Sequence, residues 1–297
     1  MNINRCIVVF IRGEEMSTNP LSKYFRKPEI YVKLPSAGKF NPEIPQTVLD
    51  EIGVCPMTAI DEITMKNPDA LLNGEALISV IKSCVPSIPD PRRLPNIDAE
   101  ALYLAIQYAT YGEEITHTHK CEKCEEVNEF SIDINYILDK FPELSDIEPI
   151  EWEGLKIHVR PSSVESITRL SLIELEQKKI VANVSANAGK DLDEDNGDKL
   201  TKTLYSSFKK IASLNVDLLG NVVDRIETPD GVVSDYNQIV EFLYNVPSTL
   251  VDEISKLART ISKRPKETSE FEFHCPECEH KQVVALEVNP VNFFKTG

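Results

Sequence analysis

Two short stretches decide the fold: Cys121-Glu122-Lys123-Cys124 and Cys275-Pro276-Glu277-Cys278. Each lies between two segments with the residue pattern of β-strands. A C-x2-C pair at the tip of a β-hairpin directs both thiolates to one side of a tight turn, where they supply half of a tetrahedral metal shell. Two such hairpins therefore predict one joint metal site, and its ligands are Cys121, Cys124, Cys275 and Cys278.

The two pairs are unusually far apart, since 150 residues separate Cys124 from Cys275. In familiar zinc ribbons this distance is about 15 to 20 residues. Loop-closure entropy grows slowly with length, by about 0.6 kcal/mol per doubling, so the spacing does not forbid a shared site. The chain between the pairs must then be a folded body whose ends meet at the ribbon. The alternative is that the pairs are separate or carry no metal.

Zinc is the metal that four thiolates suit best, and an iron–sulfur cluster is the alternative because four cysteines commonly hold one. A thioredoxin-type dithiol is disfavoured, since that role places C-x2-C at a helix start within a βαβ unit. His117 and His119 precede the first pair, and His274 precedes the second. Four cysteines fill the shell without them, so we expect these histidines beside the site or at the surface.

Composition restricts the partners. The 297 residues include 48 acids and 32 bases, for a formal charge of −16. This charge argues against sequence-independent binding of nucleic acid and against adsorption to anionic membranes. A zinc-ribbon nucleic-acid binder stays as a rival reading, although glutamates rather than lysines crowd the first pair. No apolar run approaches the length of a membrane span. Seven cysteines without a secretory signal favour a reduced, cytosolic setting over a disulfide framework.

No catalytic motif is present. The chain lacks a G-x-S-x-G elbow, a P-loop, a dinucleotide fingerprint and an H-E-x-x-H helix. We therefore predict that the protein is not an enzyme. A redox protein or metalloenzyme is the rival reading, and it would need an exchangeable coordination position or an iron–sulfur centre.

The predicted fold class is α+β, with a mainly helical body, short β-hairpins and a split zinc ribbon made of the two C-x2-C knuckles. We predict a dispensable leader at 1–15, with translation from Met16, and then an extended proline-rich arm at 16–56. The arm holds a strand-like run at 29–34 and either lies on a partner or wraps its own domain.

The rest of the chain is predicted to form a helical N-terminal domain at 57–114 and the split ribbon at 115–135 and 268–290. Between the two parts of the ribbon lies an α+β insert at 136–267, with an acidic loop at 186–198.

Capping and turn residues locate several elements. Thr58 is expected to cap a helix ending near Met65, Asp98 to cap a helix over 99–111, and Gly112 to end that helix. Ser162-Ser163-Val164-Glu165 predicts a capping box for a long helix to about Ala182. Turn sequences predict two β-hairpins, one at Glu153-Gly154 and one at Thr228-Pro229-Asp230-Gly231. Further helices are predicted at 133–140, 199–213, 236–244 and 248–262.

Several blocks together resemble the baseplate hub-assembly proteins of T-even-like contractile-tailed bacteriophages: 20–28, 34–40, 56–62, 68–74, 84–86 and 98–112. The resemblance implies a virion or virion-assembly protein without catalytic residues, made in the host cytoplasm and acting in the tail baseplate hub. Its implied partners are other baseplate or hub proteins. From composition we expect no nucleic-acid partner and no membrane span. The arm and the block 57–74 are the expected partner surface, and we expect the apolar residues of the block to belong to the core.

Overall fold

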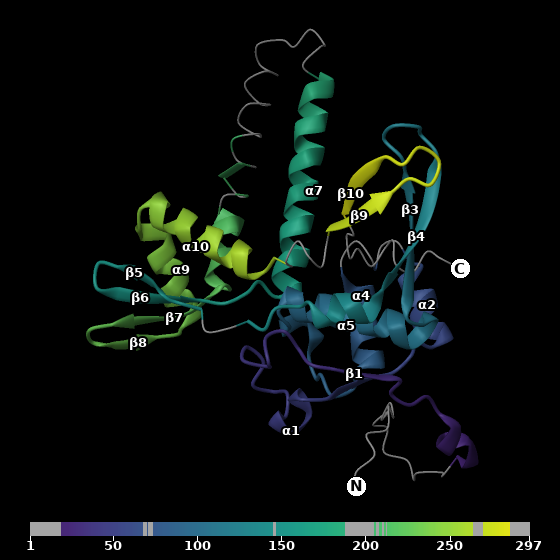
Figure 1. Ribbon diagram of the computed structural model, residues 1–297. Helices are drawn as coiled ribbons and strands as arrows, with labels where there is room; N and C mark the ends of the chain where they lie inside the picture. The colour runs from purple at the N-terminus through teal and green to yellow at the C-terminus, as the bar shows by residue number, and fades with distance from the viewer. Residues whose placement is uncertain are drawn as a thin grey trace. The chain divides into compact units, whose positions relative to one another are not determined.

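The computed structural model describes residues 19–67, 70, 74–144, 147–187, 205, 208–209, 211, 213–263 and 270–285. The chain forms two compact units: unit 1 is Met1–Ser145 with Lys263–Gly297, and unit 2 is Asp146–Ser262. Both combine helices with small antiparallel sheets, so the fold is mixed α+β (Figure 1). A helical majority, a zinc ribbon and the finer domain boundaries remain predictions. The expected leader and most of the expected acidic loop lie outside the described residues.

The arm of unit 1 begins with a 3-10 turn, η1 (Pro20–Tyr24), which buries none of its residues. Beyond it, the Arg26 side chain donates to the carbonyl oxygen of Pro56 at 2.5 Å and to the hydroxyl of Ser83 at 2.7 Å. Strand β1 (Ile30–Val32) then pairs antiparallel with β2 (Ile52–Val54). From Arg26 onward, the arm therefore packs on its own unit, whereas η1 lies free of the core.

Helical segments follow in the part of unit 1 that the structure describes. Their bounds are α1 Gln46–Leu49, α2 Ala59–Met65, α4 Glu75–Cys84, η2 Pro91–Arg93 and α5 Asn96–Tyr111. Thr58 caps α2 as predicted, because its hydroxyl accepts the Asp61 N–H and the Asp61 carboxylate accepts the Thr58 N–H. Met57 and Met65 are buried as expected of core residues, but Ile60 and Ile63 of the same block are exposed.

Helix α5 begins earlier than predicted, and Asp98 does not cap it. The helix starts at Asn96, after Pro95, so Asp98 lies inside the first turn. Its buried carboxylate instead accepts the Ser36 N–H at 2.8 Å and the Ser36 hydroxyl at 2.5 Å. The prediction of a cap was wrong because a distant partner competes for this side chain. Gly112 ends α5 as predicted, with a φ of 104° that favours glycine.

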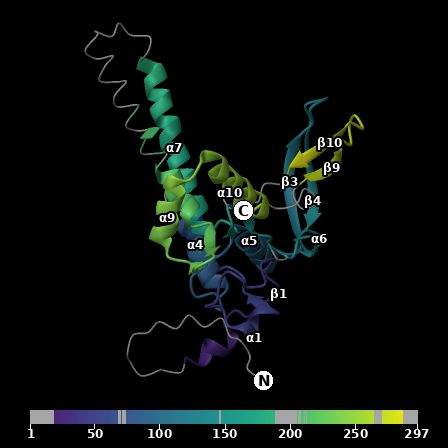
Figure 2. The ribbon, with the colours of Figure 1, turned by 90° about the vertical axis from the view of Figure 1, so that its left-hand side faces the viewer.

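The two cysteine pairs lie on separate hairpins of unit 1. Strand β3 (Glu114–Lys120) pairs with β4 (Val127–Asp133), and β9 (Glu270–His274) pairs with β10 (Lys281–Ala285). Asp133 caps a short helix after the first hairpin, α6 (Ile134–Asp139), through the Asn135 N–H. Ile134 and Ile137 of α6 pack with Leu104 of α5. The hairpins lie side by side in both views, although they are distant in sequence (Figure 2).

Unit 2 contains a four-stranded antiparallel sheet in the order β5-β6-β7-β8. Its strands are β5 Ile150–Trp152, β6 Leu155–Val159, β7 Val223–Thr228 and β8 Gly231–Val233. Both predicted hairpins form, with positive φ at Glu153 and Gly154 in the first turn. Pairing of β6 with β7 joins them into one sheet.

The helices of unit 2 whose bounds are described are α7 Val164–Asn187, α9 Tyr236–Asn245 and α10 Ser248–Ile261. Apolar residues of α9 and α10, including Leu243 and Ile254, pack with Ile157 and Ile226 of the sheet. The start of α7 differs from the prediction, because the Ser163 hydroxyl accepts the Ser166 N–H and Glu165 pairs with Arg169 outside the cap. The predicted helix over 199–213 lies mostly outside the described residues.

Candidate metal centre

The two hairpin tips have the same backbone structure. In the first, the Cys121 N–H donates to Glu126 O at 2.8 Å and the Glu125 N–H donates to Cys121 O at 3.0 Å. In the second, the Cys275 N–H donates to His280 O at 3.0 Å and the Glu279 N–H donates to Cys275 O at 2.9 Å. Glu125 and Glu279 both adopt the left-handed region, with φ of 62° and 56°. Each tip is thus a knuckle that turns its two thiols the same way.

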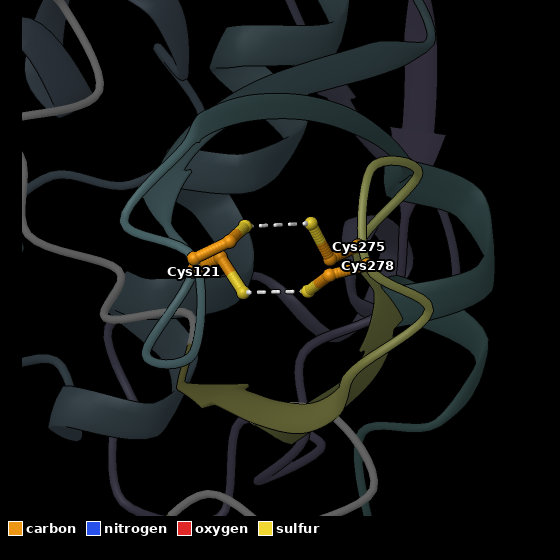
Figure 3. A group of neighbouring side chains, drawn as sticks. Cys121, Cys275 and Cys278 are labelled. Carbon is orange, nitrogen blue, oxygen red and sulfur yellow. Dashed lines mark hydrogen bonds between the residues drawn. The ribbon is translucent and has the colours of Figure 1, made fainter.

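The four thiols converge between the hairpins. The Sγ atoms of Cys121 and Cys278 are 3.6 Å apart, as are those of Cys124 and Cys275. All four sulfur atoms lie within 4.8 Å of one another. Figure 3 shows Cys121 on one hairpin facing Cys275 and Cys278 on the other. The structure therefore brings together all four cysteines that the sequence singled out.

These distances suit a shared metal ion better than disulfides. A disulfide needs sulfur atoms about 2.05 Å apart. A tetrahedral ion with metal–sulfur bonds of about 2.3 Å needs sulfur atoms about 3.8 Å apart. The Cys121–Cys278 and Cys124–Cys275 separations of 3.6 Å are close to the second value, and the other sulfur pairs lie within 4.8 Å. The four cysteines can thus hold a metal ion, and soft thiolates favour zinc or an iron–sulfur centre over hard cations.

The pKa is lowered for the first cysteine of each knuckle and raised for the second. Backbone N–H groups of Cys124 and Lys123 lower the pKa of Cys121. Burial raises the pKa of Cys275, but N–H groups of Cys278 and Glu277, together with the thiols of Cys124 and Cys278, outweigh burial and bring it to about 6. The Glu126 N–H acts to lower the pKa of Cys124, yet burial and the neighbouring thiols raise it to about 12. Four thiolates this close together need a cation to neutralise them.

Two buried amides connect the knuckles, and sequence reasoning missed both. The Asn128 side chain donates to the sulfur of Cys275 at 3.6 Å and to Glu126 O at 3.2 Å. The Gln282 side chain accepts the Glu122 N–H at 3.1 Å. Each amide thus reaches the opposite knuckle. Both are the seventh residue after the first cysteine of their own knuckle, and this shared position was the available signal.

Aromatic rings shield one side of the cluster. Phe130 and Phe273 come from opposite hairpins, and their ring centroids are 5.2 Å apart. They pack with the buried side chains of Cys121 and Cys275. This packing limits solvent access to the first cysteine of each knuckle, while Cys124 stays exposed.

The histidines lie around the cluster rather than in it. The rings of His117 and His119 pack against Phe130 and Phe273, at centroid distances of 5.4 Å and 6.4 Å. Burial lowers the pKa of His117, and the nearby His119 lowers it further. His274 is exposed, and only the four cysteines form a metal-ligating group among the described residues.

The fold and site define a class of protein: an α+β chain whose distant hairpins meet at four thiols. Within the described residues, no helix has the length and apolar character required to cross a membrane. Residues 27–295 match the family model described as T4 bacteriophage base plate protein. The chain belongs to this family and is a structural component of a phage tail baseplate. No curated protein and no solved structure matches it.

Proposed function

We propose that the protein is a non-enzymatic component of the baseplate hub or of its assembly, and that it acts as a protein–protein binding module. Membership of the baseplate family supports the tail location and interaction with other phage proteins. We further propose that the chain acts in the hub, that it is made and works in the host cytoplasm during assembly, and that it binds other proteins there. The observation that carries the binding role is the exposed apolar and aromatic surface of η1 and α2 in unit 1.

The module is proposed to be stabilised by one zinc ion bound to Cys121, Cys124, Cys275 and Cys278. The convergence of four sulfur atoms within 4.8 Å of one another and the N–H donors to the thiols support a closed structural site. Such a site would join residues 114–133 to residues 270–285, and the bound ion would contribute directly to folding. An iron–sulfur cluster uses the same ligands and is the second candidate.

Elemental analysis of the purified full chain tests the metal. We expect one zinc per chain, no visible absorbance, and loss of zinc in Cys275→Ser. Cys84→Ser is the matched control, since Cys84 is a buried free thiol of unit 1 outside the cluster. Bound iron with visible absorbance would show that the site holds an iron–sulfur cluster instead of zinc. A wild-type chain without bound metal would show that the four cysteines do not form a metal site.

Purification of tails from infected cells tests the role in assembly. A tagged chain should recover baseplate proteins, and cells lacking the chain should accumulate incomplete baseplates. Complete, infective tails made without the chain would contradict the proposal. The metal measurement is independent of this result.

A further inference from the structure

Unit 1 carries opposite charges at its two ends, in a chain that is acidic as a whole. The two hairpins at 114–133 and 270–285, which we call the ribbon, contain ten acidic residues and only three lysines. The arm segment 19–33 has the reverse balance, with four basic residues and Glu29 as its only acid. In both views the purple η1 turn lies at the end of unit 1 opposite to the hairpins (Figures 1 and 2).

The arm also exposes apolar surface that its own unit does not cover. Leu21, Tyr24 and Phe25 are exposed, and Tyr24 keeps 73% of its surface accessible. The ammonium group of Lys23 lies 4.9 Å from the centroid of the Tyr24 ring. Lys27 is exposed beside them, whereas Arg26 is turned inward to Pro56 and Ser83. The arm is therefore anchored by one cation and presents the others together with aromatic rings.

The ribbon offers the complementary combination of acids and aliphatic side chains. Val127 is 60% exposed, and Glu129 follows on the same face of β4 because side chains alternate along a strand. Val283 is 62% exposed on β10 and pairs directly with Glu272 of β9. Each hairpin thus presents an exposed valine next to an exposed carboxylate.

We infer that the arm of one copy docks on the ribbon of a second copy of this chain. Lysines would pair with the ribbon glutamates, and the aromatic rings would cover the exposed valines. Since the two surfaces lie at opposite ends of unit 1, one copy cannot satisfy both by itself. The contact is head-to-tail, so repetition closes a ring or extends a filament. This inference rests on the binding role proposed above and supplies one partner for it.

Sedimentation of the full chain over a range of concentrations tests the contact. At about 0.1 M salt, screening acts beyond about 10 Å, so the overall charge repels weakly while close pairs still attract. We expect the mean mass to rise with concentration there and to return to that of the monomer at about 1 M salt. A wild-type chain that stays monomeric at 0.1 M salt overturns the inference.

Charge reversal identifies the surfaces. Lys23→Glu with Lys27→Glu reverses the charge at two positions of the arm, and Glu129→Lys with Glu272→Lys reverses the charge at two positions of the ribbon. Each double variant should be monomeric when pure, because the side chains at positions 23 and 27 then carry the same sign as those at positions 129 and 272, which they meet in the proposed contact. An equimolar mixture should associate again, since the new acids at positions 23 and 27 of one variant then meet the new lysines at positions 129 and 272 of the other only if these positions face each other. Association of either pure variant at the wild-type level, or failure of the folded mixture to associate, overturns the proposed pairing.

A matched control changes the same charge elsewhere. Glu241→Lys with Glu253→Lys alters two exposed acids of unit 2 and should leave association unchanged. Circular dichroism and zinc content establish that each variant is folded. Incorporation of the chain into tails is measured separately. A chain that is monomeric but still enters tails would show that a second copy is not the partner of the arm, while the proposed function would still stand.

Discussion

The buried carboxyl group of Asp98 should make unit 1 less stable as the pH rises toward neutrality. Its side chain is fully buried and has Ser36 as its hydrogen-bonding partner. Burial raises its pKa from 3.8 to about 6, although the two hydrogen bonds from Ser36 act in the opposite direction. The folded state therefore holds the proton more tightly than the unfolded state does.

The direction and size of the effect follow from this difference in pKa. The contribution to the free energy of unfolding is fully present below the unfolded pKa of 3.8 and is lost as the pH rises through about 6. At about 1.4 kcal/mol per pKa unit, the loss is about 3 kcal/mol. Asp98→Asn stays neutral at every pH and can still accept the Ser36 N–H. Part of this loss has already occurred at pH 4, which is just above the unfolded pKa, so the stability of the variant relative to wild type should increase by about 2.4 kcal/mol between pH 4 and pH 7.

Urea unfolding followed by pulsed hydrogen exchange measures this difference in unit 1. The chain is equilibrated at each pH and urea concentration, labelled briefly under fixed conditions, and read by mass spectrometry on peptides of α5. A constant offset from altered hydrogen bonding in the variant does not matter, because only the change with pH is compared. Titration of other groups is common to both proteins and cancels.

The fluorescence of Trp152 supplies the control within the same samples. Trp152 belongs to β5 of unit 2, so its unfolding transition should respond to pH equally in both proteins. A difference in unit 1 stability that varies by less than about 1 kcal/mol from pH 4 to pH 7 would refute the reasoning. It would mean that the folded structure holds Asp98 ionised at little cost.

Three further changes test other parts of unit 1. Glu279→Gly should raise the stability of the zinc-loaded chain by about 1 kcal/mol, because a left-handed φ of 56° strains any residue with a Cβ; an unchanged or lower melting temperature would argue against strain. Asn128→Ala should weaken zinc binding 10- to 100-fold in competition with a chelator, since the Asn128 amide donates a hydrogen bond to the sulfur of Cys275. Zinc affinity equal to that of wild type would show that the amide contributes only to packing. Arg26→Ala should cost about 2 kcal/mol in chemical unfolding, because Asp61 loses its ion pair but keeps Thr58; a loss under 0.5 kcal/mol would show that the arm is not anchored there.

Local signals predicted local structure well. Thr58 with Asp61 defined the start of α2, and Gly112 defined the end of α5, because each acts through hydrogen bonds or dihedral preferences within a few residues. The tight turn sequences of unit 2 gave both hairpins for the same reason. The gathering of the four thiols was also predictable, since two identical knuckle patterns have one obvious way to complete a tetrahedron. That they bind metal stays a prediction.

Apart from the four thiols, contacts between distant residues could not be predicted from the sequence. Asp98 was predicted to cap the helix because its hydrogen-bonding partner, Ser36, is 62 residues away in the sequence and no local pattern indicates this contact. The pairing of β6 with β7 depends on how the chain between them folds, so two hairpins could not be recognised as one sheet. Asn128 and Gln282 were missed because amides on a strand usually face solvent, and only the opposite knuckle gives them a reason to be buried.

The join between the hairpins explains why a metal ion would matter in this chain. Closing a flexible loop of 150 residues costs on the order of 5 kcal/mol, and the folded unit 2 within it lowers that cost. Burial of Phe273 and Val284 offsets about 3 to 5 kcal/mol. The cost of loop closure and the gain from burial nearly cancel. Without a metal ion, the joined and the separate arrangement of the two hairpins would therefore have similar free energies. Four metal–sulfur bonds would decide that balance, and with it whether the acidic ribbon exists as a single surface.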